Sequence, residues 1–248
     1  FLSNNAVRTV AQLLALVAAL LVTVVALTGP ADPPSNIAPW ALYVTFWVGL
    51  VPVSLLLGPV WKYANPLRLV HRLLRSLTGP APREGELDRL GMWPAALSLA
   101  VFVWLELVYP GRAEPVTVGL FIVVYAVTML IASLWYGERW FERSDAFEVY
   151  SSLISRLSPW GVRADGRWVV RSPLRNVATL PVIPGLAAVV VVLVGSTAFD
   201  GLSRTEYWTS GPGAANDTTS GTLGLAVMIA ITGLLYVAGT RGSGRLAR

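Results

Sequence analysis

Two acidic residues, Glu106 and Asp200, fall inside segments that are otherwise apolar enough to cross a membrane. A carboxylate is costly to place in a bilayer, so acids kept there commonly bind cations or transfer protons. Both are predicted near the external ends of their segments. The candidate ion or proton site, which would open outward, comprises Glu106, Asp200, Tyr109 and Tyr43. The alternative is that Asp200 ends a helix and that Glu106 reaches the headgroup region or pairs with Arg112.

An all-oxygen site of this kind suits hard cations such as Mg²⁺ or Ca²⁺. The chain contains no Cys and a single His, His71. These counts do not support a haem, Fe–S or Zn site, so no metal ligand is assigned and any cofactor is unknown. A Ser–His–Asp triad would have to use His71, which lies on a basic amphipathic segment and is interpreted as an interfacial residue.

Three further polar residues have the types and spacing of helix starts. Asn65 precedes a proline, and Asp145 is followed three positions later by Glu148, as in capped helix N-termini. Apolar residues then recur at spacings of three and four in both segments, which indicates amphipathic helices along the cytoplasmic membrane surface. The two segments lie about 80 residues apart and resemble a weak repeat. A chance match is the alternative.

Six apolar segments approach the roughly 20 residues needed to cross a bilayer core. They cover residues 10–28, 40–61, 92–109, 116–135, 180–199 and 222–239. The predicted fold class is all-α, a polytopic transmembrane helical bundle, with residues 1–248 forming one integral membrane domain. A large soluble core of buried helices is the alternative. The one predicted exception to helix is a short β-hairpin around Asp165-Gly166.

The basic residues predict the orientation of these spans. Of the 19 Lys and Arg residues, only Arg112 and Arg204 fall on one side of the alternation. The others lie at the two termini and in the loops 62–91 and 137–179, which the positive-inside rule places in the cytoplasm. We therefore expect anionic lipids at the cytoplasmic face, and other membrane subunits, as partners. Nucleic acid is not expected, because the basic residues lie in loops between spans.

Five strings in the chain match one family. They are residues 46–52, 104–109, 145–150 (except Glu148), 156–159 and 196–203. They resemble a family of actinobacterial polytopic membrane proteins commonly labelled fenitrothion hydrolase. The resemblance runs through most of the chain and includes Glu106, Asp145 and Asp200. It implies a multi-pass protein of the bacterial cytoplasmic membrane, and the label implies hydrolysis of organophosphate esters. Family members extend beyond both ends of this chain, which therefore resembles a central fragment.

These observations lead to three functional hypotheses. We expect a transport or membrane-complex component with an outward acidic pair, rather than an enzyme. The first alternative is a membrane-bound hydrolase of organophosphate-type esters, with Glu106 and Asp200 as metal ligands or general base. The second is a structural subunit of a larger membrane complex.

Overall fold

Five helices of the described chain are long and apolar enough to cross a membrane. They are α1 (Asn5–Thr28), the continuous stretch Ile37–Leu57, α8 (Pro115–Tyr136), α12 (Leu186–Ser203) and α14 (Thr218–Leu246). A sixth, α7 (Trp93–Leu107), qualifies when it is joined to the helical residues Glu84–Leu90 before it. This computed structural model describes residues 5–162, 168–170 and 172–246. It confirms the prediction of an all-helical chain with several helices of membrane-spanning length.

The second predicted span, residues 40–61, begins three residues earlier and ends four residues earlier than expected, at Ile37 and Leu57, and its helix is irregular. It begins as α2 (Ile37–Pro39), continues as the π-helix η2 (Trp40–Val48) and ends as α3 (Leu50–Leu57). The Gly49 amide donates to the Val44 carbonyl five residues earlier, at 3.1 Å. Pro52 contributes to the irregularity, because a proline ring excludes the carbonyl four residues before it and provides no amide hydrogen.

Glycine and proline set two helix ends that the apolar pattern alone misplaces. Gly58, with a φ of 90°, ends α3, so α4 (Val60–Ala64) is a separate short helix. Few residues other than glycine adopt this conformation without strain. The predicted span 180–199 starts instead at Leu186, directly after Pro184 and Gly185, whose φ is 84°.

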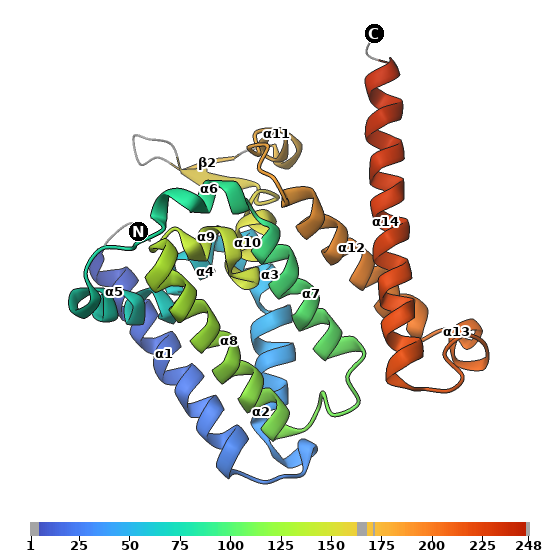
Figure 1. The fold of residues 1–248 in the computed structure, drawn as a ribbon, viewed down its shortest axis with the longest axis horizontal. Helices are drawn as coiled ribbons and strands as arrows, with labels where there is room; N and C mark the ends of the chain where they lie inside the picture. Colours follow the sequence, from blue (N-terminus) through green and yellow to red (C-terminus); the bar gives the residue numbers. More distant parts are fainter. Residues whose placement is uncertain (1–4, 163–167, 171, 247–248) are drawn as a thin grey trace. The chain divides into compact units, whose positions relative to one another are not determined.

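The described residues form two compact units. Unit 1 comprises Phe1–Gly91 and Ala113–Val182, and unit 2 comprises Met92–Arg112 and Ile183–Arg248. In unit 1, α1 packs along α8, and α5 (Pro66–Thr78) packs against both (Figure 1). The helix α10 (Ala146–Ser155) packs on α3, α4 and α9 (Trp140–Ser144). The single domain expected over residues 1–248 stays a prediction.

One buried apolar cluster of unit 1 lies where α8 and α9 meet the helix α6 (Leu87–Leu90). Leu87, Met129, Trp140 and Phe141 are buried together there. Leu87 belongs to α6, which follows the 3-10 turn η3 (Glu84–Glu86). A second 3-10 turn, η1 (Pro33–Ser35), connects α1 to α2.

Unit 1 also contains the described strands. They are β1 (Trp160–Val162) and β2 (Trp168–Val170), paired antiparallel with Gly161 opposite Val169. This pairing agrees with the predicted hairpin, although its Asp165-Gly166 turn lies outside the described residues. The short helix α11 (Pro173–Ala178) follows β2.

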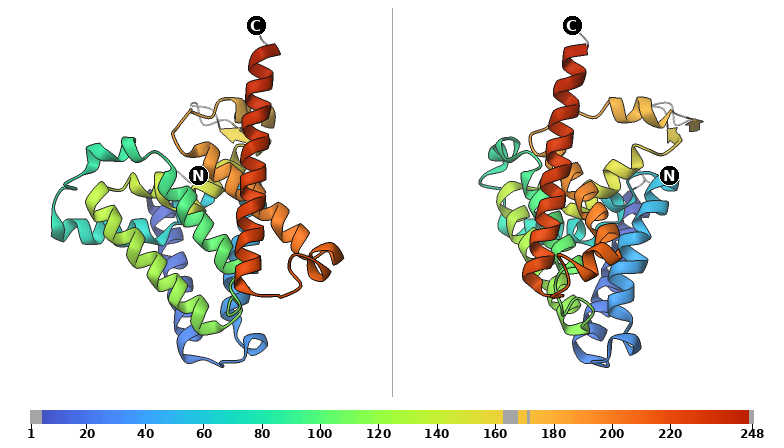
Figure 2. Two further views of the ribbon diagram at one scale, coloured as in Figure 1. Left: turned by 45° about the vertical axis from the view of Figure 1, so that its right-hand side comes forward. Right: turned by 90° about the vertical axis from the view of Figure 1, so that its right-hand side faces the viewer.

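Unit 2 is built on α12, which packs along α14 and α7. A side chain at Gly195 of α12 would place its Cβ 2.7 Å from the Cα of Ile229, so glycine permits the close approach to α14. The short helix α13 (Glu206–Ser210) follows α12, and the Trp208 ring packs edge-on against Phe199 at 5.3 Å. Figure 2 shows α14 as one uninterrupted helix.

Candidate functional site

The acidic pair predicted from the sequence lies in unit 2. Asp200 on α12 accepts hydrogen bonds from Nη2 and Nε of Arg204, one turn later, at 2.9 and 3.1 Å. Glu106 lies in the last turn of α7, where the charge of Asp200 repels its carboxylate and the charge of Arg112 attracts it. Asp200 is therefore already neutralised in part by a side chain of its own helix.

The two predicted tyrosines do not lie together in one unit. Tyr109 follows α7 in unit 2, with its ring 5.8 Å from that of Trp104, and Tyr43 lies on η2 of unit 1. No group of three or more His, Asp or Glu side chains within residues 5–162, 168–170 and 172–246 is arranged to hold a metal ion. An ion or proton role for the four residues stays a prediction.

The three predicted cap residues lie together in unit 1. Asn65 caps α5, because its Oδ1 accepts from the Leu67 amide at 3.0 Å. Asp145 caps α10, because its Oδ1 accepts from the amides of Phe147 and Glu148 at 2.9 and 3.1 Å. The two buried caps also bond to each other, since Asn65 Nδ2 donates to Asp145 Oδ2 at 2.8 Å. The N-termini of two helices therefore meet through their capping side chains.

The third residue after each cap forms a second contact between the same two helices. Arg68 Nε donates to Glu148 Oε2 at 3.0 Å, and Arg68 Nη2 donates to Oε1 of the same carboxylate. Bidentate pairs of this kind are the stronger charge-assisted hydrogen bonds. Asn65 Nδ2 also donates to Glu148 Oε2, at 3.2 Å. Both contacts join matching positions of the two segments that resemble a repeat, and a five-residue helix, α4 or α9, precedes each segment.

Further acidic and aromatic groups surround Arg68. Its Nη1 donates to Glu138 Oε1 at 3.0 Å, and its guanidinium lies 5.4 Å from the centre of the Phe141 ring. Burial lowers the pKa of Arg68, but the hydrogen bonds and charges of Glu148 and Glu138 outweigh this effect, so the pKa is raised. Burial raises the pKa of Glu148, against the hydrogen bonds and charge of Arg68. The cluster thus holds a charged guanidinium in an almost fully buried position.

An apolar cavity of about 430 Å³ lies beside this cluster, entirely within unit 1. Its wall comes from α1, η2, α8 and the beginnings of α5 and α10. Five of its lining residues are alanines, and these small side chains leave the space open: Ala15, Ala18, Ala19, Ala41 and Ala126. Ala18 and Thr45 are exposed, so the cavity reaches the surface of unit 1 beside α1 and η2. Its volume falls within the roughly 300–1,000 Å³ typical of ligand sites.

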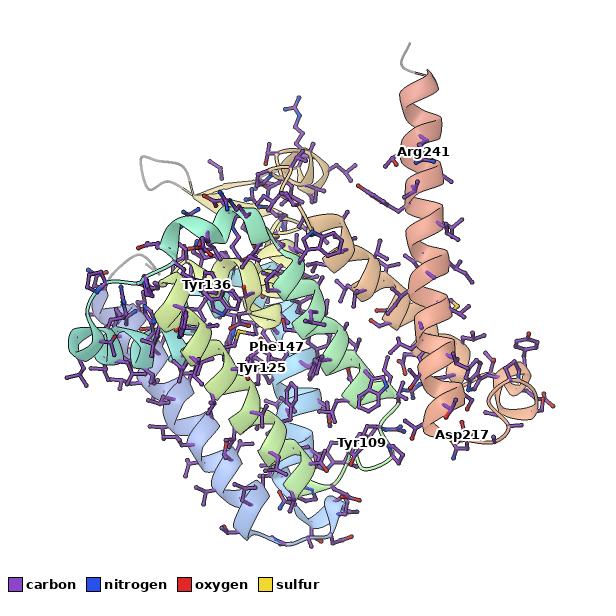
Figure 3. All side chains as sticks on the ribbon, in the orientation of Figure 1. Tyr109, Tyr125, Tyr136, Phe147, Asp217 and Arg241 are labelled. Carbon is purple, nitrogen blue, oxygen red and sulfur yellow. The ribbon has the colours of Figure 1, made fainter. Side chains whose placement is uncertain are left out.

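The cavity has one polar end, where a carboxylate that is almost fully buried belongs to the lining. Asp145 contributes the only carboxylate among the described residues that line it. Tyr125, also in the lining, donates its hydroxyl to Asp145 Oδ1 at 2.9 Å and accepts from the Ala146 amide at 3.0 Å. The Tyr125 and Phe147 rings lie beside each other, 5.2 Å apart (Figure 3). Burial raises the pKa of Asp145, against the hydrogen bonds that it accepts.

Part of the cavity wall also has an unusual backbone conformation. The π-helix η2 contributes Ala41, Leu42, Thr45 and Phe46 to the lining. π-Helical segments are rare and often occur at functional sites. A cavity, a buried carboxylate and a π-helix therefore coincide at one place in unit 1.

His71, expected at the lipid interface, is instead buried in unit 1 and 2% exposed. Its Nδ1 lies 2.8 Å from the Ser133 hydroxyl of α8, and its ring packs edge-on against Phe141. Burial lowers the pKa of His71 below its ordinary value. The apolar stripe of α5 therefore indicated an amphipathic helix, but not that its histidine would face the protein interior.

Sequence reasoning did not identify the cavity, Tyr125 or the buried role of Arg68. Two signals point to them in retrospect: the alanines spaced along the first span, and the equal 80-residue separations of Asn65 from Asp145 and of Arg68 from Glu148. No protein-family model, curated protein or solved structure matches this chain significantly.

Proposed function

We propose that this chain is a transport or complex-forming membrane component whose unit 1 binds a small, membrane-soluble molecule. One observation carries the proposal: membrane-length helices α1 and α8 and the π-helix η2 enclose an apolar cavity of about 430 Å³ that ends at a buried carboxylate. The exposed lining residues Ala18 and Thr45 would admit a ligand from the lipid.

The proposed orientation follows from the distribution of charge. The loops 62–91 and 137–179 are basic, so we place them, with both termini, in the cytoplasm of a bacterium. The helices α5 and α10 then lie at the cytoplasmic end of unit 1. Arg75 of α5 would contact anionic headgroups there, whereas Arg72 of the same helix bonds to Gln12 and lies near Glu138.

The acidic pair supports an additional role for unit 2 in binding a cation or transferring a proton. Glu106 and Asp200 repel each other, and a bound cation or a proton would relieve this repulsion. The contact of Arg204 with Asp200 and the charge of Arg112 acting on Glu106 already supply part of this neutralisation. The ligand cavity therefore remains the stronger basis for a function.

The proposal is tested by filling the cavity. In an Ala19→Leu/Ala126→Leu variant, two larger side chains would project from α1 and α8 into the space. We expect the wild-type protein, purified in mild detergent, to retain a small organic ligand detectable by native mass spectrometry. The filled variant should retain less than half of the wild-type amount of this ligand.

Ala230→Leu provides the matched control, because Ala230 is an exposed alanine of α14 in unit 2 and does not line the cavity. It should retain the ligand at the wild-type level. A wild-type protein that carries no ligand after purification and reconstitution, or equal retention in the filled variant, would overturn the proposal.

A further inference from the structure

The apolar wall of the cavity cannot by itself select a ligand within a bilayer. Lipid tails are as apolar as the alanine, leucine and phenylalanine side chains of the wall, so moving an apolar molecule from lipid into the cavity gains little hydrophobic free energy. Selection must therefore come from shape and from the polar end. That end is formed by Asp145 and Tyr125.

The hydrogen bonds already made at this end indicate which kind of ligand group could still bind there. Oδ1 of Asp145 accepts from the Phe147 and Glu148 amides and from the Tyr125 hydroxyl. Oδ2 accepts from Asn65 Nδ2 at 2.8 Å. A carboxylate oxygen has about two acceptor positions. Oδ1, with three donors, is therefore more than filled, whereas Oδ2, with one, has capacity for one more donor. The Tyr125 hydroxyl already donates its hydrogen to Asp145. A ligand that bonds to Oδ2 at this end of the cavity therefore has to supply a hydrogen-bond donor.

The charges around Asp145 disfavour an anionic ligand. The four hydrogen-bond donors to Asp145 are neutral groups, and the nearby guanidinium of Arg68 is engaged by Glu148 and Glu138. The Asn65 amide already bridges the carboxylates of Asp145 and Glu148, at 2.8 and 3.2 Å. A carboxylate or phosphate placed here would add a negative charge to a buried site whose lining, among the described residues, includes no Lys or Arg to pair with it.

We infer that the cavity of unit 1 binds a single-chain lipophilic alcohol, whose hydroxyl donates a hydrogen bond to Asp145 Oδ2 while its chain lies along the alanine-lined wall. This inference rests on the proposed function and specifies its ligand class. The cavity volume of about 430 Å³ lies in the lower half of the range of ligand sites, which suits one chain better than two.

The test compares three photoreactive probes with the same 16-carbon chain, ending in an alcohol, a methyl ether or a carboxylate. Each is added to the wild-type protein in lipid nanodiscs and crosslinked, and labelled peptides are identified by mass spectrometry. The alcohol should label peptides of α1, η2 and α8 about tenfold more than the ether, because the ether lacks the donor. The carboxylate should label no better than the ether.

An Asp145→Asn variant should lose this preference for the alcohol. Asparagine is as good a helix cap as aspartate, but it would replace the Oδ2 acceptor with an amide that donates. Asp32→Asn, at an exposed position of unit 1, is the matched control and should keep the preference. If the Asp145 variant does not fold, the wild-type comparison of alcohol with ether still decides, because the two probes differ by one donor.

The outcomes separate the inference from the proposed function. Equal labelling of the cavity by the alcohol and the ether, stronger labelling by the carboxylate, or a preference for the alcohol that a folded Asp145→Asn variant keeps, would overturn the alcohol assignment and leave a ligand cavity. An absence of labelling on α1, η2 and α8 by every probe would overturn both.

Discussion

Replacing Arg68 with methionine should destabilise unit 1 more than any change at its surface. The substitution leaves the Glu148 carboxylate, which is 1% exposed, without its guanidinium partner and close to the second buried carboxylate, Asp145. Removing one partner of a buried ion pair typically costs about 3–5 kcal/mol, because the remaining charge stays desolvated. The lost bond to the half-exposed Glu138 adds less than about 1 kcal/mol.

The free energy of unfolding can be measured by denaturant titration in mixed micelles, followed by the fluorescence of the chain's 10 tryptophans. Arg139→Met is the control, because its partner Asp88 and its own side chain are both more than half exposed. It should cost less than about 1 kcal/mol. A double variant, Arg68→Met/Glu148→Met, should recover much of the loss, since an apolar pair can replace a buried ion pair.

The reasoning would be refuted if Arg68→Met cost no more than Arg139→Met. It would also fail if the double variant were no more stable than Arg68→Met alone. In either case Glu148 would be stabilised in the folded chain by groups other than Arg68.

Two further predictions concern pH and helix packing. Because burial lowers the pKa of His71 below 6.5, the unfolded chain binds the proton more readily, so His71 should stabilise the fold above about pH 6.5 and lose this effect as the pH falls. In a His71→Gln variant the melting temperature should therefore fall less between about pH 7.5 and 5.5 than in the wild type. An equal fall in the two proteins would contradict this. Gly195→Ala should lower the melting temperature, because the added Cβ would lie 2.7 Å from the Ile229 backbone. Gly201→Ala is the control, because a Cβ there would meet nothing within 4 Å. Equal melting temperatures of the two variants would refute the packing argument.

Apolar length predicted six spans, of which five are single membrane-length helices and the sixth qualifies only as a bent pair. Their approximate positions were predictable because crossing a bilayer demands a long apolar segment whatever its neighbours. Helix ends were less predictable. The pattern carries the second span through residue 61, but the positive φ of Gly58 ends α3 at Leu57. A hydropathy average does not register one glycine among many apolar residues, although its backbone decides where the helix stops.

Local signals identified Asn65, Asp145 and Glu148 as helix-start residues, since capping depends on positions a few residues apart. That the caps bond to each other depends on how two helices 80 residues apart pack, which no local pattern encodes. The pairing of Arg68 with Glu148 could not be predicted for the same reason. The cavity is harder still to predict, because it arises where side-chain volume is missing at facing positions of different helices.

The matched contacts explain why the acids gather beside the cavity. Two helix N-termini that meet present like partial charges, each equivalent to roughly half a positive charge. Asp145 and Glu148 supply negative charge at this junction, and Asn65 supplies the amide that bonds to both carboxylates. Arg68 then balances Glu148, which leaves Asp145 with neutral partners. The Asp145 carboxylate thus joins the two segments and is also the acceptor at the end of the cavity. The junction of the repeat-like segments and the proposed selection of an alcohol therefore depend on one side chain.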